Sequence, residues 1–269
     1  MSYEIDYIIP VVDNASIAGN YNKIPFDLQD SRAAEPLVRF SDYDIACDDY
    51  EARSICGDDP YKEQIGGATL HVWGRKTVAE KLVRVNGLLR PKGAEVFVWD
   101  AYRSIESQKF FWDYYLRQAK RRLPQASEDE RKNYALTLVS DPSGFDPSEA
   151  TTWPIHACGG AVDLGLRDLK TREFQDISAG FNEKGRIPYS DALERKLLAK
   201  EIAKDDPRLV FRRLLHWAMS QEGFINNPLE YWHFDYGDQM YVLYLQALKG
   251  ACAPQAAWYG YVNSPESAG

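Results

Sequence analysis

The sequence contains no long hydrophobic stretch. No segment approaches the run of about 18 apolar residues that a membrane-spanning helix needs. The first residues, MSYEIDYIIPVVD, carry acidic side chains early and include no extended apolar run, which is unlike a secretory signal peptide. We therefore expect no membrane partner, and we expect the protein to act in the cytoplasm.

The sequence also lacks an excess of positive charge. Its 40 Asp and Glu residues outnumber its 32 Lys and Arg residues, and the formal net charge at pH 7 is −8. Proteins that bind nucleic acids or anionic membrane surfaces usually carry a basic patch, so we expect neither kind of partner. The densest basic run, Lys120-Arg121-Arg122, is interpreted as the solvated end of a polar helix.

Cysteine is scarce, and no two cysteines form a CxxC pair. The four residues are Cys47, Cys56, Cys158 and Cys252. In a reducing compartment we expect free thiols; a Cys47–Cys56 disulfide remains the alternative if the protein is secreted. Cys158 is interpreted as a small packing residue rather than a metal ligand.

What the sequence does contain is an alternation of helical and strand-like segments. Apolar residues at helical spacing predict a helix over residues 76–89, and Ser104 is a plausible N-cap for a second helix over 105–122. Further helices are expected at about 127–140, 190–204, 207–222 and 239–249. Short apolar or aromatic runs predict strands at 94–99, 161–166 and 230–236. These elements predict an α+β fold in a single domain, with a small central antiparallel sheet flanked by helices.

The domain limits follow from composition. Residues 1–65 are acidic, rich in Asp, Asn and Pro, and nearly without periodicity, so we interpret them as a loop-rich wrap over the same domain. The core is predicted to span residues 66–250, and residues 251–269 are predicted to form a C-terminal tail.

Histidine is as scarce as cysteine in this sequence. The chain has four, at positions 71, 156, 216 and 233. His216 stands in a helical LLHWAM run and His71 in a strand-like TLHVW run, and both are interpreted as structural. A zinc site usually needs His or Cys ligands, so His156 and His233 become the candidates.

His156 and Asp163 belong to one short segment, which reads PIHACGGAVD from Pro154. His156 ends a loop, two glycines let the backbone bend, and Asp163 lies on the predicted strand that follows. A loop-to-strand turn of this kind can bring both side chains to one metal ion. Taken alone, this spacing is common by chance.

His233 ends a second segment, Glu230-Tyr-Trp-His233. Strict alternation along a strand would place Glu230 and His233 on opposite faces, whereas a bulge, or a strand that starts after Glu230, lets both reach one site. His156, Asp163 and His233 would then supply three ligands and leave a fourth position for water, as catalytic zinc requires. Glu230 is the candidate general base for that water.

Arg103 lies in a third segment, Asp100-Ala-Tyr-Arg103, between a predicted strand and a predicted helix. A guanidinium there could stabilise the oxyanion of a tetrahedral intermediate, and Asp100 could orient it. The alternative is a purely structural ion pair. Tyr102, Tyr231 and Trp232 are expected to wall the cleft, although core packing explains these aromatic residues equally well.

Together, these three segments resemble the D-alanyl-D-alanine dipeptidases of the VanX type, which are zinc peptidases related to D,D-carboxypeptidases and to the hedgehog signalling domain. The family pattern is Asp-x-Tyr-Arg, then Ser-x-His-x-x-Gly-x-Ala-x-Asp, then Glu-Trp-Trp-His. The chain carries these motifs in the same order and at similar separations, over about residues 70–240.

The resemblance implies one zinc ion per chain, held by His156, Asp163 and His233. It also implies that Glu230 is the general base and then the acid, that Arg103 stabilises the transition state, and that the fold is the α+β core of the D,D-peptidase and hedgehog group. The implied activity is hydrolysis of a small peptide of D-amino acids, D-Ala-D-Ala first, in peptidoglycan turnover, D-alanine salvage or glycopeptide resistance.

Two positions depart from the family pattern. Pro154 replaces the Ser that precedes the first His by two residues. The family also has a Phe-Asp pair about nineteen residues after the zinc-binding Asp. The Asp of this pair binds the free ammonium group of the dipeptide substrate. In this sequence the corresponding pair is Phe181-Asn182. An amide accepts a hydrogen bond from an ammonium but lacks the charge, and the next residue, Glu183, is a possible substitute.

The departure at Asn182 keeps two other functions open. One is a carboxypeptidase or amidase that acts on longer or N-modified peptides of the peptidoglycan type. The other is a zinc-stabilised binding module without catalysis, as hedgehog-type domains suggest. A base at the metal, Glu230, argues for an enzyme.

Overall fold

A computed structural model describes residues 7–10, 21–48, 51, 54, 61–179, 181–182, 185–186 and 188–266, with the backbone alone for 181–182, 185–186 and 251. The α-helices of these residues are α2 (Lys76–Leu89), α3 (Ile105–Arg122), α4 (Glu128–Leu136), α5 (Ala192–Leu198), α6 (Pro207–Gln221) and α7 (Gln239–Lys249). The strands are β1 (Leu37–Arg39), β2 (Ala46–Cys47), β3 (Trp73–Arg75), β4 (Ala94–Asp100), β5 (Val162–Asp168), β6 (Phe181–Asn182), β7 (Gly185–Arg186), β8 (Ile225–Asn226) and β9 (His233–Asp235). Short 3-10 helices connect them: η2 (Tyr21–Lys23), η3 (Ser31–Ala34), η4 (Phe40–Tyr43), η5 (Arg90–Lys92), η6 (Ala150–Thr152), η7 (Ile155–Cys158) and η8 (Gly250–Cys252).

The central sheet has five strands in the order β2-β4-β5-β9-β8. β4, β5, β9 and β8 pair antiparallel in turn, whereas β2 runs parallel to β4. The α+β class is confirmed, but the sheet is mixed rather than purely antiparallel. β2 lies inside the segment that the sequence indicated as loop, because a two-residue strand is too short to show alternation.

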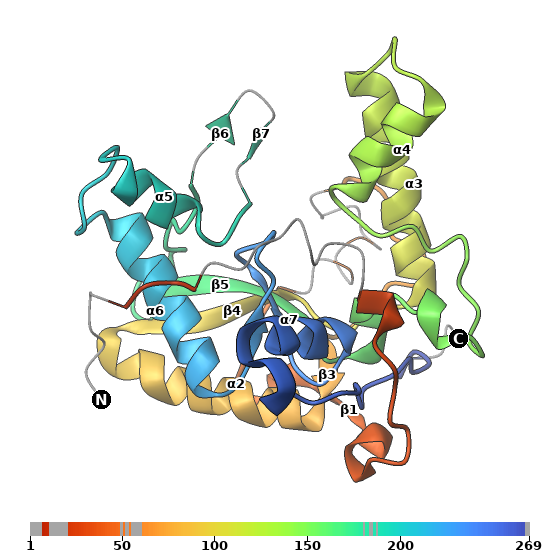
Figure 1. The fold of residues 1–269 in the computed structure, drawn as a ribbon, viewed down its shortest axis with the longest axis horizontal. Helices are drawn as coiled ribbons and strands as arrows, with labels where there is room; N and C mark the ends of the chain where they lie inside the picture. The colour runs from red at the N-terminus through yellow and green to blue at the C-terminus, as the bar shows by residue number, and fades with distance from the viewer. Residues whose placement is uncertain are drawn as a thin grey trace.

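Helices α2 and α6 supply much of the core on one side of the sheet. α2 packs against β4, and α6 packs against α2 and β5 (Figure 1). Val78, Leu82 and Val85 repeat at helical spacing and are fully buried, which explains why this helix forms where the pattern predicted it. The side chain of Asn86 accepts a hydrogen bond from the Val96 N–H at 2.9 Å, which ties the helix to the sheet.

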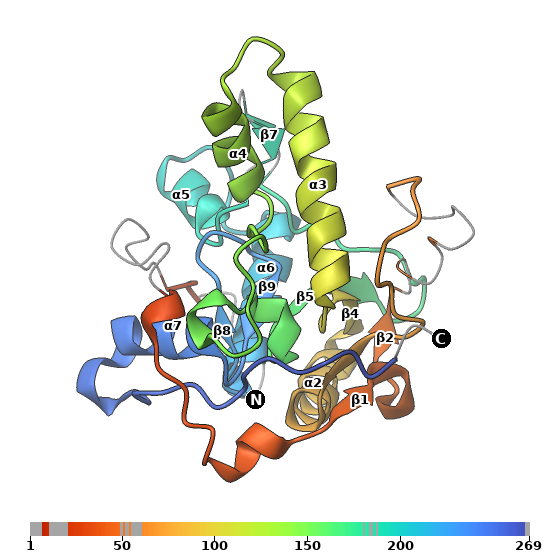
Figure 2. The ribbon, with the colours of Figure 1, turned by 90° about the vertical axis from the view of Figure 1, so that its right-hand side faces the viewer.

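Helices α3 and α4 form a hairpin that projects from the body of the molecule (Figures 1 and 2). α3 begins where the sequence predicted, because the Ser104 hydroxyl caps it by accepting from the Ser107 N–H at 3.0 Å. α4 begins with a capping box between Ser127 and Glu130 and ends at Leu136, earlier than expected.

Segments from opposite ends of the described chain pack together. The Ala257 N–H donates to the Pro25 carbonyl at 2.9 Å, and the buried Tyr259 hydroxyl bonds Glu35. Residues 257–266, here called the C-terminal strap, then run along η7, where the Val262 N–H donates to the Ala157 carbonyl at 3.1 Å. The domain limits at 65 and 250 stay predictions, and these contacts cross both of them.

Among the described residues, no helix combines the length and hydrophobicity required to cross a membrane. The basic run at the end of α3 is exposed, as predicted. Cys158 and Cys252 are free thiols, and Cys158 is buried as a packing residue, whereas Cys56 lies outside the described residues, so its pairing stays a prediction.

Candidate metal centre

His156 lies on η7, and a backbone carbonyl orients its ring. Nδ1 is 2.7 Å from the Ala101 carbonyl oxygen. A carbonyl oxygen only accepts, so this contact assigns the hydrogen to Nδ1 and leaves the lone pair on Nε2, which is 3.7 Å from Oδ2 of Asp163. Burial, with the nearby charge of Arg103, lowers the pKa of His156 and favours the neutral ring that a metal ligand needs.

The turn between His156 and Asp163 depends on two glycines. Gly159 ends η7 with φ at 73°, a left-handed conformation that glycine adopts without strain. At Gly160 there is no room for a side chain, because a Cβ would lie 2.5 Å from the Tyr236 carbonyl oxygen. The close backbone approach sets the His156 loop against the end of β9 just before β5 begins.

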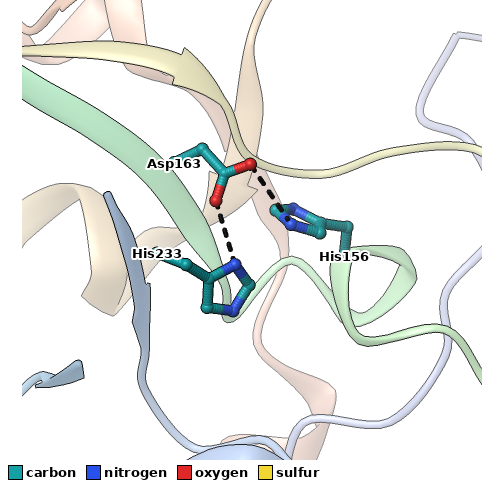
Figure 3. A group of neighbouring side chains, drawn as sticks. All are labelled: His156, Asp163 and His233. Atoms are coloured by element: carbon teal, nitrogen blue, oxygen red, sulfur yellow. Dashed lines mark hydrogen bonds and ion pairs between the residues drawn. The ribbon is translucent and has the colours of Figure 1, made fainter. Parts of the chain in front are cut away.

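Asp163 and His233 face each other across the sheet. They are directly paired in the antiparallel ladder between β5 and β9, so their side chains leave the same face. Oδ1 of Asp163 is 2.9 Å from Nδ1 of His233. Figure 3 shows the carboxylate between the two rings, and one ligand atom from each of the three residues lies within 4.8 Å of the others. The structure therefore brings the three predicted ligands together.

Asp235 orients the second histidine, and sequence reasoning missed it. Its Oδ1 is 2.8 Å from Nε2 of His233, and its side chain is fully buried. Both carboxylates accept from the ring, so Asp235 holds a hydrogen on Nε2 and Asp163 accepts the hydrogen on Nδ1, which a bound metal ion would replace. The signal was available, since residues two apart on a strand share a face.

The charges of the centre are strongly coupled. Burial alone would raise the pKa of Asp163, but His156 and His233 hold it at about 2. Burial opposes protonation of His233, yet Asp235 and Asp163 raise its pKa well above the ordinary value. The site thus attracts positive charge, which is the electrostatic condition for binding a cation.

Glu230 lies at the edge of this centre, just before β9. A turn in which the His233 N–H donates to the Glu230 carbonyl at 3.0 Å precedes the strand, so alternation does not separate the two side chains. Oε2 of Glu230 is 3.8 Å from Nδ1 of His233. Burial, with the charge of Asp163, raises the pKa of Glu230 to about 7, although His233 and Arg103 act in the opposite direction.

Arg103 lies beyond the end of β4. A bulge between Val98 and Asp100 aligns Asp100 with Asp163, and Asp100 accepts hydrogen bonds from Nε of Arg103 at 2.9 Å and from Nη2. The ion pair that the sequence suggested is therefore present. The positive charge of Arg103 also lowers the pKa values of Asp163 and Glu230, so it favours the charged form of both carboxyl groups.

The predicted substrate contacts are not brought together in the same way. Tyr102 is buried and its hydroxyl donates to the Val262 carbonyl at 3.1 Å, which is a packing role under the C-terminal strap. Trp232 is half-buried and lies edge-on to Tyr231, with ring centroids 4.8 Å apart. Asn182 lies on β6, where only the backbone is described, and Glu183 is outside the described residues.

The remaining histidines have structural surroundings. Nδ1 of His216 is 2.8 Å from the Tyr7 hydroxyl, and burial lowers the pKa of His216 to about 4. His71 is half-buried, with its ring 6.4 Å from that of Trp73. Both environments agree with the assignment made from the sequence.

Two solved structures show a partial likeness to this chain. One is VanYB in complex with D-Alanine-D-Alanine, with 16% sequence identity, a TM-score of 0.39, and coverage of 67% of this chain and 80% of that one. The other is the vancomycin resistance D,D-pentapeptidase VanY in complex with Zn(II), with 17% identity, a TM-score of 0.35, and coverage of 67% and 81%.

The sequence comparisons are more informative. A D-alanyl-D-alanine dipeptidase from Synechocystis sp. is 29% identical over 158 residues, which is 55% of this chain. The match spans 61% of that relative, so the chain covers about three fifths of the length of the curated protein. The profile of a family described as D-ala-D-ala dipeptidase matches residues 39–248, which include all five charged and histidine residues proposed for the site. The chain therefore belongs to the D-ala-D-ala dipeptidase family.

Proposed function

We propose that the protein is a zinc peptidase that hydrolyses a dipeptide of D-amino acids, D-Ala-D-Ala first, and releases D-alanine. The proposal rests on the position of the Glu230 carboxylate. Its Oε2 lies 3.8 Å from Nδ1 of His233, which forms the candidate metal site with His156 and Asp163. Membership of the D-ala-D-ala dipeptidase family supports the same substrate.

The donor set fits zinc. The hydrogen bond at Nδ1 of His156 leaves Nε2 free to coordinate. Nδ1 of His233 would coordinate after giving up the hydrogen that Asp163 accepts, and Asp163 would add a carboxylate. Two histidines and one carboxylate are a frequent set for catalytic zinc, which keeps a fourth position open. Zinc bound there would supply an acidified water and would polarise the peptide carbonyl.

Glu230 serves as the acid and base of the reaction. A carboxyl whose pKa is about 7 can take a proton from the attacking water and give it to the leaving amine near neutral pH. Arg103 holds a fixed positive charge beside the centre and stabilises the oxygen of the carbonyl as it becomes negative. The peptide C–N bond breaks, and water supplies OH to the acyl part and H to the amine.

The first experiment measures D-alanine release by the zinc-loaded protein from D-Ala-D-Ala and, in parallel, from N-acetyl-D-Ala-D-Ala. We expect release from the free dipeptide, and we expect Glu230→Ala to abolish it while zinc content and folding are kept. Hydrolysis that persists in Glu230→Ala contradicts the assigned mechanism. A wild-type protein that cleaves neither compound contradicts the proposed substrate.

The second candidate function is a carboxypeptidase or amidase for longer or N-modified peptides. It is favoured by Asn182, which stands on the β6–β7 hairpin where the family pattern has the ammonium-binding Asp. The same experiment separates the two functions, because faster release from the N-acetylated compound supports this alternative. A binding module without catalysis is supported only if Glu230→Ala and the wild type are equally inactive while both bind zinc.

The partner we propose is thus a small peptide, with a role in the turnover of cell-wall peptides. The cytoplasmic location expected from the sequence stays a prediction. Fractionation of cells that express the full-length protein tests it directly.

A further inference from the structure

The guanidinium of Arg103 is restrained on more than one side. Asp100 accepts from Nε and Nη2, as described above. At the other end, Nη1 donates to Oε1 of Gln108 at 2.9 Å, and the Phe111 ring lies 5.0 Å from the guanidinium carbon. Gln108 is on the first turns of α3 and only 2% exposed. It touches neither the three ligands nor Glu230 through any hydrogen bond that the structure shows.

We propose that Gln108 is a positioning residue for catalysis, which fixes the guanidinium of Arg103 where the carbonyl oxygen of the substrate becomes negative. This inference rests on the proposed function. It adds a residue that no motif in the sequence indicated and that acts only through Arg103.

The orientation of the Gln108 amide is itself determined. Its Nε2 donates to the carbonyl oxygen of Ser140 at 2.8 Å and to the Ser140 hydroxyl at 3.1 Å. Arg103 offers only donors and the Ser140 carbonyl only accepts, so a flipped amide would lose both bonds. A series of hydrogen bonds from Ser140 through Gln108 to Arg103 therefore connects the guanidinium to the segment after α4. Because Gln108 is buried, water does not compete for these hydrogen bonds.

An amide suits this position better than a carboxylate. Gln108 accepts from the guanidinium without adding negative charge, whereas Asp100 already supplies one carboxylate to the same cation. A second carboxylate would lower the positive potential that Arg103 offers to a developing oxyanion, although it would keep the hydrogen bond to Arg103 and the size of the side chain. It would also lose the bond to the Ser140 carbonyl, which only accepts.

The test is a double-mutant cycle with Gln108→Leu and Arg103→Ala, measured as kcat and KM of the zinc-loaded protein on D-Ala-D-Ala. We expect Gln108→Leu to lower kcat about 10- to 100-fold, the range found for residues that orient an active-site group, with a much smaller change in KM. In the Arg103→Ala background, we expect Gln108→Leu to have no further effect on kcat. An equal fold-loss in both backgrounds, or no loss in the wild-type background, overturns the proposal.

Two further variants keep the test decisive if Gln108→Leu folds poorly. Gln108→Glu preserves the size of the side chain, and we expect it to lower kcat as well, because it neutralises Arg103. Asn86→Ala is the matched control: it removes another buried amide, which accepts from the Val96 N–H on β4, and it should lower thermal stability without changing kcat. A Gln108→Glu variant with wild-type kcat contradicts the proposal.

A separate readout distinguishes failure of this inference from failure of the proposed function. If the wild type hydrolyses only the N-acetylated substrate, the cycle is run on that compound, and the proposed substrate alone is wrong. If Arg103→Ala retains wild-type kcat on the substrate that is cleaved, Arg103 has no catalytic role and the inference about Gln108 fails with it. Affinity for a phosphinate dipeptide analogue, a tetrahedral anion, should fall by the same factor as kcat/KM in Gln108→Leu.

Discussion

At the scale of single residues, hydrogen bonds decide which nitrogen each histidine offers to a metal. The Ala101 carbonyl leaves Nε2 of His156 available, and the Asp235 carboxylate holds a hydrogen on Nε2 of His233, so Nδ1 is the nitrogen that a metal ion would bind. A backbone carbonyl therefore orients His156, whereas a buried carboxylate orients His233. A backbone carbonyl cannot be removed by mutation, whereas Asp235 can.

We predict that Asp235→Asn lowers zinc affinity about 10- to 100-fold, because an amide orients the His233 ring with less charge and does not select one tautomer. Competition with a chromophoric chelator measures the affinity. Asp44→Asn, which changes an exposed carboxylate, serves as the control and should leave the affinity unchanged. Equal affinity in Asp235→Asn and the wild type would show that the His233 tautomer is fixed by other contacts.

His216 predicts a specific loss of stability in acid. Its pKa is about 4 in the folded protein, against 6.5 for an ordinary histidine, because burial disfavours the charged ring. The unfolded chain therefore binds more protons between these values, so the contribution is complete above pH 6.5 and is lost as the pH falls towards 4. Between pH 7 and pH 5 the free energy of unfolding should fall by about 2 kcal/mol from this residue.

Urea unfolding at pH 7 and pH 5 measures this effect. In His216→Gln the drop between the two pH values should be smaller by about 2 kcal/mol than in the wild type. Tyr7→Phe is the control, because it removes the hydrogen bond to His216 but keeps the ring, so the acid-dependent drop should persist. An unchanged drop in His216→Gln would mean that other groups cause the acid sensitivity.

The site residues differ in how visible they are in the sequence. His156, Asp163 and His233 carry their own chemistry and lie in motifs, so their convergence was predictable. Asp235 was recoverable from the two-residue period of a strand, once the strand was known to start at His233. Gln108 gave no signal, because its role depends on Ser140, 32 positions away, being folded back onto it.

At the scale of elements, the long helices were predictable and the short strands were not. α2, α3 and α7 form over the residues expected, because each combines an apolar stripe with capping or turn residues. β1, β2, β3 and β8 have two or three residues each, too few for a periodic pattern. The parallel pairing of β2 with β4 depends on a crossover that no local pattern records.

The C-terminal strap contributes to the metal centre through the backbone. The Val262 N–H donates to the carbonyl of Ala157, the residue after His156, and Ala157 is buried. We predict that Val262→Pro, which removes this donor, lowers the free energy of unfolding by about 1–3 kcal/mol and also weakens zinc binding. Thermal unfolding and chelator competition measure the two effects.

Asn263→Ala is the matched variant for the strap, since the side chain of Asn263 accepts an exposed bond from the Tyr261 hydroxyl. We expect it to change neither stability nor zinc affinity appreciably. If Val262→Pro loses stability but keeps full zinc affinity, the strap stabilises the fold without orienting His156.

At the scale of the whole molecule, the metal and the fold should stabilise each other. The ligands come from η7, β5 and β9, and His233 lies 70 positions after Asp163, so zinc would bind the folded chain in preference to the unfolded one. With free zinc at 100 times its Kd, we predict that folding is stabilised by about 3 kcal/mol and that Tm rises by roughly 5–10 °C. Differential scanning calorimetry of the chelator-treated and zinc-loaded protein measures the rise, which should vanish in His156→Ala.

The contacts between distant parts of the chain also constrain when the site can form. Glu35 and Tyr259 are 224 positions apart in the sequence, and the strap that follows Tyr259 supplies a restraint on the His156 loop. At translation rates of about 5–20 residues per second, the segment around Glu35 waits roughly 10–45 seconds for its partner to emerge from the ribosome. Zinc should therefore bind tightly only after synthesis of the chain is complete. A partly synthesised chain already contains His156, Asp163 and His233, but it should bind zinc weakly and have no activity.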